Sequence, residues 1–107
     1  MQTLRGTIVD TINELNKLLH LTTDEGEKRK LRMLRNSYFA LLDEVLEQDL
    51  DNTTDEFKAA IGMLEEAQVS IVEAKKDIAK VASAINVLNK AARAVDRVVD
   101  IGIGFVT

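Results

Sequence analysis

Few residues in this sequence have the type and spacing that catalysis or metal binding needs. Asp49, Asp51 and Thr53 are spaced like the first ligands of a calcium-binding loop. Thr54 stands where such a loop needs Gly, and Ala60 stands where it needs a bidentate Glu. We therefore expect no calcium site in this segment.

The single histidine, His20, is expected to serve as a helix cap or a surface group. It lies at the end of a predicted helix, where a cation interacts favourably with the helix dipole. The chain has no Cys, no Glu-x-x-His pair, no Gly-rich phosphate loop and no nucleophile elbow. We expect a protein that is not an enzyme, with no catalytic residue, no metal and no cofactor.

The composition indicates a helical protein that can form a hydrophobic core. The 107 residues amount to one domain, 46% of them are hydrophobic, and there is no Pro to interrupt a helix. The net charge is −4. No apolar run is long enough to cross a bilayer, and the N-terminal residues lack a signal-peptide core. These features predict a cytoplasmic protein.

The clearest helical pattern lies in residues 54–100. Its apolar positions alternate in steps of three and four, which keeps one stripe facing a partner helix. Thr53 and Glu56 form a capping-box pattern at the start, and Gly102 and Gly104 favour an end before an apolar tail, 101–107. The stripe consists of Phe57, Ala60, Leu64, Ala67, Ile71, Ala74, Ile78, Val81, Ile85, Leu88, Ala92, Val95 and Val99.

Two shorter amphipathic segments precede this pattern. They predict helices over about 3–21 and 24–49, separated by a polar stretch that contains Gly26. Thr22 and Glu25 form a second capping-box pattern within that stretch. The polar stretch therefore indicates a break or a kink between the first two helices.

The lengths of these segments predict an all-α fold, a long antiparallel helical hairpin in a single domain, 1–107. Residues 3–48 and 54–99 are equally long, so two helices placed roughly end to end would match the long third helix. That third helix would reach about 69 Å. The alternative is a compact bundle in which the first helix folds back beside the second. We favour the hairpin.

The apolar surface of residues 79–99 is wider than one seam, which predicts pairing of two chains into a helical bundle. Small and branched apolar residues flank the seam there, and a hairpin cannot cover them all. The other interpretation is that these flanks are exposed helix formers. We expect a homo-oligomer, most simply a dimer, and a protein–protein interaction or structural scaffold function. The expected interface residues are Ile78, Val81, Ile85, Leu88, Val95 and Val99.

Two other functions remain open at this stage. The basic amphipathic segment Lys75–Val106 is typical of a peripheral membrane or lipid-binding protein. The acidic stretch around Asp49, Asp51 and Asp55 suits a helical immunity- or chaperone-like protein that binds a basic protein partner. The basic run 28–35 lacks interleaved aromatic residues and the chain is acidic, so we expect no nucleic acid partner.

Overall fold

The longest predicted helix breaks at Asp77, and this break sets the architecture. A computed structural model describes residues 3–47 and 54–106. Within these ranges there are four α-helices and one short 3-10 helix, and no strand. The all-α fold class is thus confirmed. The elements are α1 (Leu4–Leu21), α2 (Glu25–Glu47), α3 (Asp55–Lys76), η1 (Ile78–Lys80) and α4 (Val81–Val106).

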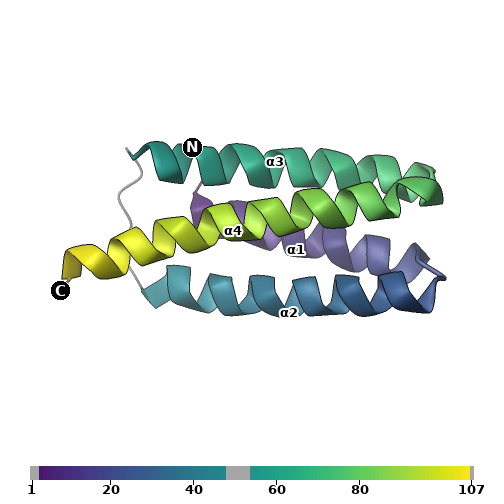
Figure 1. The fold of residues 1–107 in the computed structure, drawn as a ribbon, viewed down its shortest axis with the longest axis horizontal. Coiled ribbons are helices and arrows are strands. Elements are labelled where there is room, and N and C mark those ends of the chain that lie inside the picture. Colours follow the sequence, from purple (N-terminus) through teal and green to yellow (C-terminus); the bar gives the residue numbers. More distant parts are fainter. Residues whose placement is uncertain (1–2, 48–53, 107) are drawn as a thin grey trace.

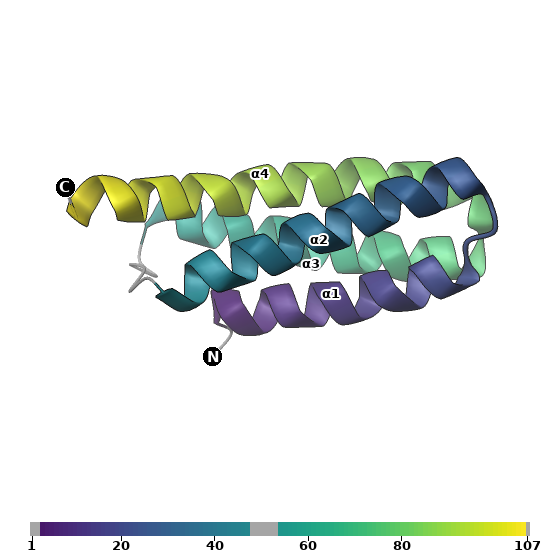
Figure 2. The same cartoon turned by 90° about the horizontal axis from the view of Figure 1, so that it is seen from below.

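The helices form two antiparallel hairpins that pack side by side. The first hairpin is α1 with α2 and the second is α3 with α4, and the two meet where α1 lies beside α3 and α2 lies beside α4 (Figures 1 and 2). Within the described residues, the backbones of α2 and α3 do not come close to each other, and neither do those of α1 and α4. These pairs sit on the diagonals of a four-helix bundle.

The predicted elongated hairpin is wrong, as is the predicted count of three helices. The first helix does not extend the second; it folds back beside it, as in the compact alternative. The segment 54–100 is not one helix but two, α3 and α4. As a result the longest dimension is 45 Å, well short of the expected rod of about 69 Å.

The break at Asp77 has a local cause. This residue has an extended conformation, with φ −141° and ψ 102°. Its carboxylate accepts a hydrogen bond from the Ala79 backbone N–H at 3.2 Å, as an N-cap does, while its own N–H bonds the Glu73 carbonyl oxygen at 3.0 Å. Asp favours such caps because its short side chain competes with the helical backbone pattern. The turn needs no Gly or Pro.

The junction between α1 and α2 differs from its prediction in the residue that caps α2. Thr22 does not cap α2, because it is the C-cap of α1 and its hydroxyl donates backwards to the Leu18 carbonyl oxygen at 2.8 Å. Asp24 takes the capping role, accepting from the Glu27 backbone N–H at 2.9 Å. The break predicted here is confirmed, and it is a full reversal of direction.

The ends of the second hairpin also depart from prediction. The N-cap of α3 is Thr54, which accepts from the Phe57 backbone N–H at 3.2 Å. The predicted cap, Thr53, lies outside the described residues. Helix α4 continues to Val106 through Gly102 and Gly104, so neither glycine ends the helix and the predicted tail is helical up to that point.

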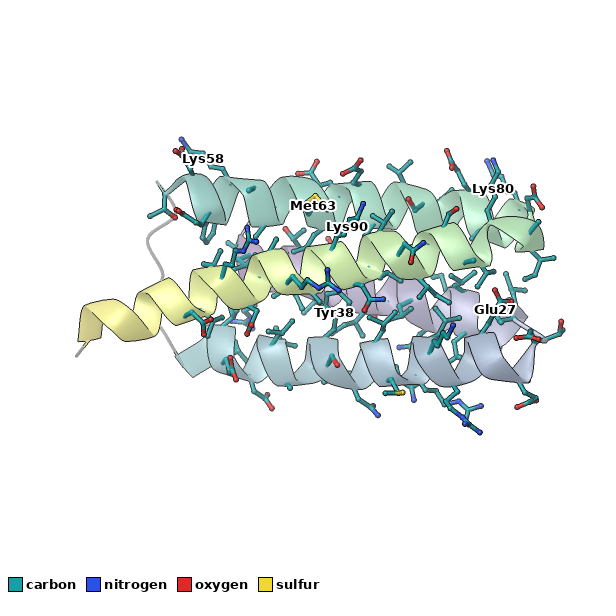
Figure 3. All side chains as sticks on the ribbon, in the orientation of Figure 1. Glu27, Tyr38, Lys58, Met63, Lys80 and Lys90 are labelled. Carbon is teal, nitrogen blue, oxygen red and sulfur yellow. The ribbon has the colours of Figure 1, made fainter. Side chains whose placement is uncertain are left out.

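All four helices contribute to one hydrophobic core. Helix α3 places small and large side chains alternately toward the interior, and its alanines allow α4 to approach closely. Charged side chains cover the outside of the bundle (Figure 3). The inward residues of α3 are Ala60, Leu64, Ala67, Ile71 and Ala74.

Tyr38 is the largest fully buried side chain and it joins the two hairpins. It lies between α2 and α4 (Figure 3), where its hydroxyl donates to the Leu88 carbonyl oxygen at 2.6 Å. Burial raises the pKa of Tyr38 well above its usual value, so the phenol stays protonated and able to donate. The bond satisfies a polar group that would otherwise be costly to bury.

Replacing Tyr38 with Phe is expected to lower the free energy of unfolding by about 1 kcal/mol, because the ring remains and the buried hydrogen bond is lost. Urea unfolding followed by circular dichroism measures this. Ser37→Ala is the matched control, since the Ser37 hydroxyl donates to the Met33 carbonyl oxygen on the exposed surface and should contribute little. Equal effects of the two substitutions would contradict the linking role of Tyr38.

Candidate protein interaction surface

The seam that was expected to need a second chain is covered within one chain. Val81, Ile85, Leu88, Val95 and Val99 are all buried in the core of the single bundle. This corrects the expectation about what covers them, because α3 turns back at Asp77 and packs on α4. Of the predicted interface residues only Ile78 is on the surface, 50% exposed in η1.

The other predicted surfaces are placed as follows. Asp49 and Asp51 lie outside the described residues, while Asp55 is exposed in the first turn of α3. Asp55 and Glu56 line a small hollow of about 200 Å³ together with Arg97 of α4, so a cation stands beside this acidic end. His20 is exposed in the last turn of α1.

The amphipathic C-terminal segment Lys75–Val106 has its apolar face inside the bundle. The buried side chains of α4 up to Val99 pack on its neighbours, and its charged residues face outward. Contact of this face with a lipid surface would require α4 to leave the bundle. No helix in the described part of the chain has the length and hydropathy that crossing a membrane requires.

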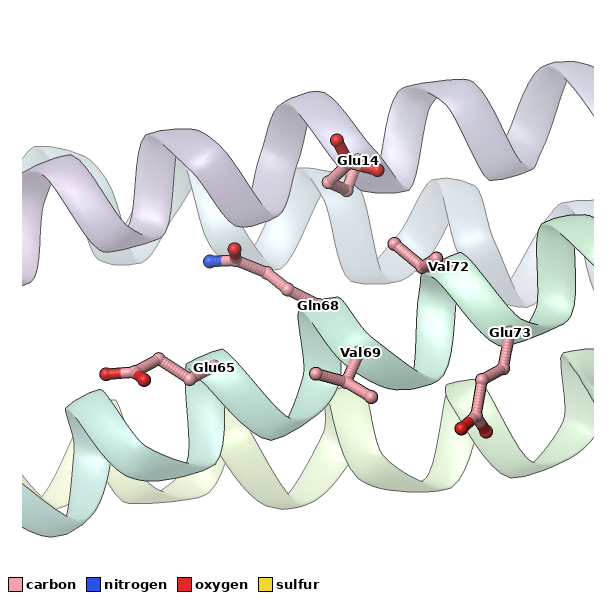
Figure 4. A pocket seen from close by; sticks show the side chains of 6 residues that line it. All are labelled: Glu14, Glu65, Gln68, Val69, Val72 and Glu73. Atoms are coloured by element: carbon pink, nitrogen blue, oxygen red, sulfur yellow. The ribbon is translucent and has the colours of Figure 1, made fainter.

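A groove that exposes apolar side chains lies between α1 and α3. The groove has a volume of about 470 Å³ and is open to solvent. Val69 is 59% exposed and Val72 is 39% exposed, both large values for branched apolar residues. Figure 4 shows these two valines on α3, with Glu14 on the facing helix. The lining residues are Glu14, Glu65, Gln68, Val69, Val72 and Glu73.

Polar contacts between α1 and α3 fix the wall of this groove. The Gln68 side-chain amide donates to Thr11 Oγ1 at 3.1 Å, and Thr11 in turn donates to the Thr7 carbonyl oxygen at 2.8 Å. Lys75 Nζ lies 2.7 Å from Glu14 Oε2. These bonds hold the two helices in register, so the valines occupy a preformed surface.

The charges of the groove divide into a paired and an unpaired set. The main influence on the Glu14 carboxylate is Lys75, which holds its pKa below the usual value. Partial burial raises this pKa, and Lys17 lowers it further. Glu65 and Glu73 form no ion pair with the other described residues. Both side chains are exposed, and they lie four residues before and four residues after Val69 on α3. The surface thus combines an apolar centre with free carboxylates.

Among the described residues, no group of three or more His, Asp or Glu side chains is placed to hold a metal ion. Comparison with protein-family models, with curated proteins and with solved structures gives no significant match to this sequence.

The sequence pattern did not single out Val69 and Val72, because the more regular apolar stripe of α3 lies on its inner face. A second row with steps of four and three does exist on the opposite face of α3. It has apolar residues only at its centre, so it does not stand out by hydropathy. The row consists of Lys58, Gly62, Glu65, Val69, Val72 and Lys76.

Replacing Lys75 with Met is expected to lower the free energy of unfolding at pH 7 by about 0.5–1 kcal/mol, because a partly exposed ion pair is lost. The folded-state pKa of Glu14 is depressed from its ordinary 4.5. The pair therefore stabilises the fold above that pH, and this contribution disappears as the pH falls through the lowered pKa.

Urea unfolding of wild type and Lys75→Met at pH 7 and pH 3 tests this dependence. The difference between the two proteins should shrink at pH 3. Lys80→Met, which removes an exposed cation from η1, serves as the control and should show no such convergence. If Lys75→Met lowers the free energy of unfolding as much at pH 3 as at pH 7, then packing of the Lys75 stem, rather than its charge, accounts for the stabilisation.

Proposed function

We propose that this chain is a non-enzymatic helical protein that works by protein–protein contact, and that it self-associates. The observation that carries the proposal is the exposure of Val69 and Val72 in one groove of the bundle. Single exposed apolar residues are common on proteins, whereas adjacent ones in a groove are more typical of a contact site.

Burial of these valines supplies a favourable free energy for association. Apolar surface contributes about 25 cal/mol for each Å² that is removed from water. A homo-dimer that uses one patch twice would bury four valines, two from each chain. The groove wall is already held by Gln68 and the Glu14–Lys75 pair, so little ordering accompanies binding.

The bundle also presents a rigid scaffold for such a contact. Helix α3 is fixed on one side by α1 and on the other by α4. Its outer face therefore keeps its side chains at constant spacing. A scaffold or adaptor function needs this kind of preorganised surface rather than a catalytic pocket.

Wild-type protein is expected to have the mass of a dimer at high concentration, measured by light scattering with sedimentation equilibrium. The variant Val69→Asp/Val72→Asp should be monomeric at the same concentration, because charges would replace the apolar centre. Its helicity and melting temperature should change little, since both side chains are exposed.

Phe39→Asp is the matched control for this experiment. Phe39 is 46% exposed on α2, which lies diagonally across the bundle from α3. This variant should keep the dimer mass. A wild type that stays monomeric would overturn self-association. Loss of the dimer in Phe39→Asp but not in the valine variant would move the interface to α2.

A further inference from the structure

A row of residues on the outer face of α3 can pair with an antiparallel copy of itself, because acidic and basic side chains then lie opposite each other. Apolar Val69 and Val72 form the centre. Glu65 precedes them by four residues, and Lys76 follows them by four. All of these side chains are exposed. An acid and a base placed symmetrically around an apolar pair is the pattern that an antiparallel helix pair uses to fix its orientation.

We infer that the self-association proposed above is an antiparallel pairing of α3 with α3 of a second copy. The two helices would be related by a two-fold axis that crosses α3 between Ser70 and Ile71. In this register Val69 faces Val72 of the second copy, and Glu65 faces Lys76 of the second copy. Each contact occurs twice, as an isologous interface requires.

The small residue of the same row, Gly62, is compatible with this register. Gly62 is exposed, and in this register it lies beyond Lys76, where α3 of the second copy ends. A Cβ at Gly62 would meet no atom of the chain within 4 Å beyond its sequence neighbours and the adjacent backbone of α3. No side chain at Gly62 would therefore hold the second copy away at this end of the overlap.

Other arrangements of the same face bring like charges together. In a parallel pair Glu65 would face Glu65 of the second copy, and Lys76 would face its own counterpart. In an antiparallel pair centred on Val69, Glu65 would face Glu73 of the second copy. Like charges directly opposed across an interface are unfavourable, so the axis between Ser70 and Ile71 is preferred among these registers.

The charge of the whole bundle favours the same orientation. The half that contains Lys58 in Figure 3 has nine acidic and three basic residues among those described, whereas the half that contains Lys80 has seven acidic and eleven basic. An antiparallel pair places the acidic half of one chain near the basic half of the other. The acidic half comprises 3–12, 37–47, 55–65 and 94–100, and the basic half 13–36 and 66–93.

A charge exchange between Glu65 and Lys76 tests this pairing. Glu65→Lys alone opposes two lysines at each of the two contacts, and Lys76→Glu alone opposes two glutamates. Each single variant should raise the dimer dissociation constant by about tenfold or more at low salt. The double variant Glu65→Lys/Lys76→Glu restores opposite charges and should return to within about threefold of wild type.

Sedimentation equilibrium over a concentration series is the measurement, with circular dichroism to show that each variant is folded. A dimeric wild type whose single variants associate normally would overturn the α3 pairing and leave self-association standing. A double variant that is as weak as the singles would overturn the register. A monomeric wild type would overturn the self-association on which the pairing rests.

Discussion

The capped turn at Asp77 is the constraint on which the rest of this structure depends. A continuous helix through this point would leave the wide apolar surface of residues 81–99 without cover in a single chain. The turn reverses the chain, so that α4 packs on α3 and on α2. The α1–α2 hairpin then completes the bundle, with Tyr38 bonded across to α4. One chain thereby buries its own seam.

The sequence predicted the helical class and the limits of the first two helices because both follow from local periodicity. It also predicted the inward residues of α3 and five of the eight buried residues of α4, since these share one heptad phase. Ala84, Ala91 and Val98, which were placed on the flanks, are buried as well. The break was missed because that phase runs through the turn without a shift, and Asp77 is its only local signal. Whether α1 lies in line with α2 or folds back beside it depends on tertiary packing, which a local pattern does not encode. Val69 and Val72 were missed because the rest of their row consists of three charged residues and one Gly.

Helix α3 has two faces with separate roles in this account. Its inner face, built from Ala, Leu and Ile, holds the fold together. Its outer face, with two exposed valines between Glu65 and Lys76, contributes little to the fold and is free to bind. On our proposal this division makes association separable from folding, because outer-face substitutions leave the core intact. The contact area of one helix pair is small, which suits reversible pairing.

The distance between two spin labels, one on each chain at position 58, tests the central claim most directly. The sequence contains no cysteine, so Lys58→Cys gives a single label site on the exposed surface of α3. Antiparallel pairing about an axis between residues 70 and 71 predicts labels separated by about 38 Å along the helix direction. A separation of about 10–15 Å, close to the spacing of neighbouring helices, would indicate parallel pairing, and the absence of any dipolar coupling at high concentration would contradict self-association.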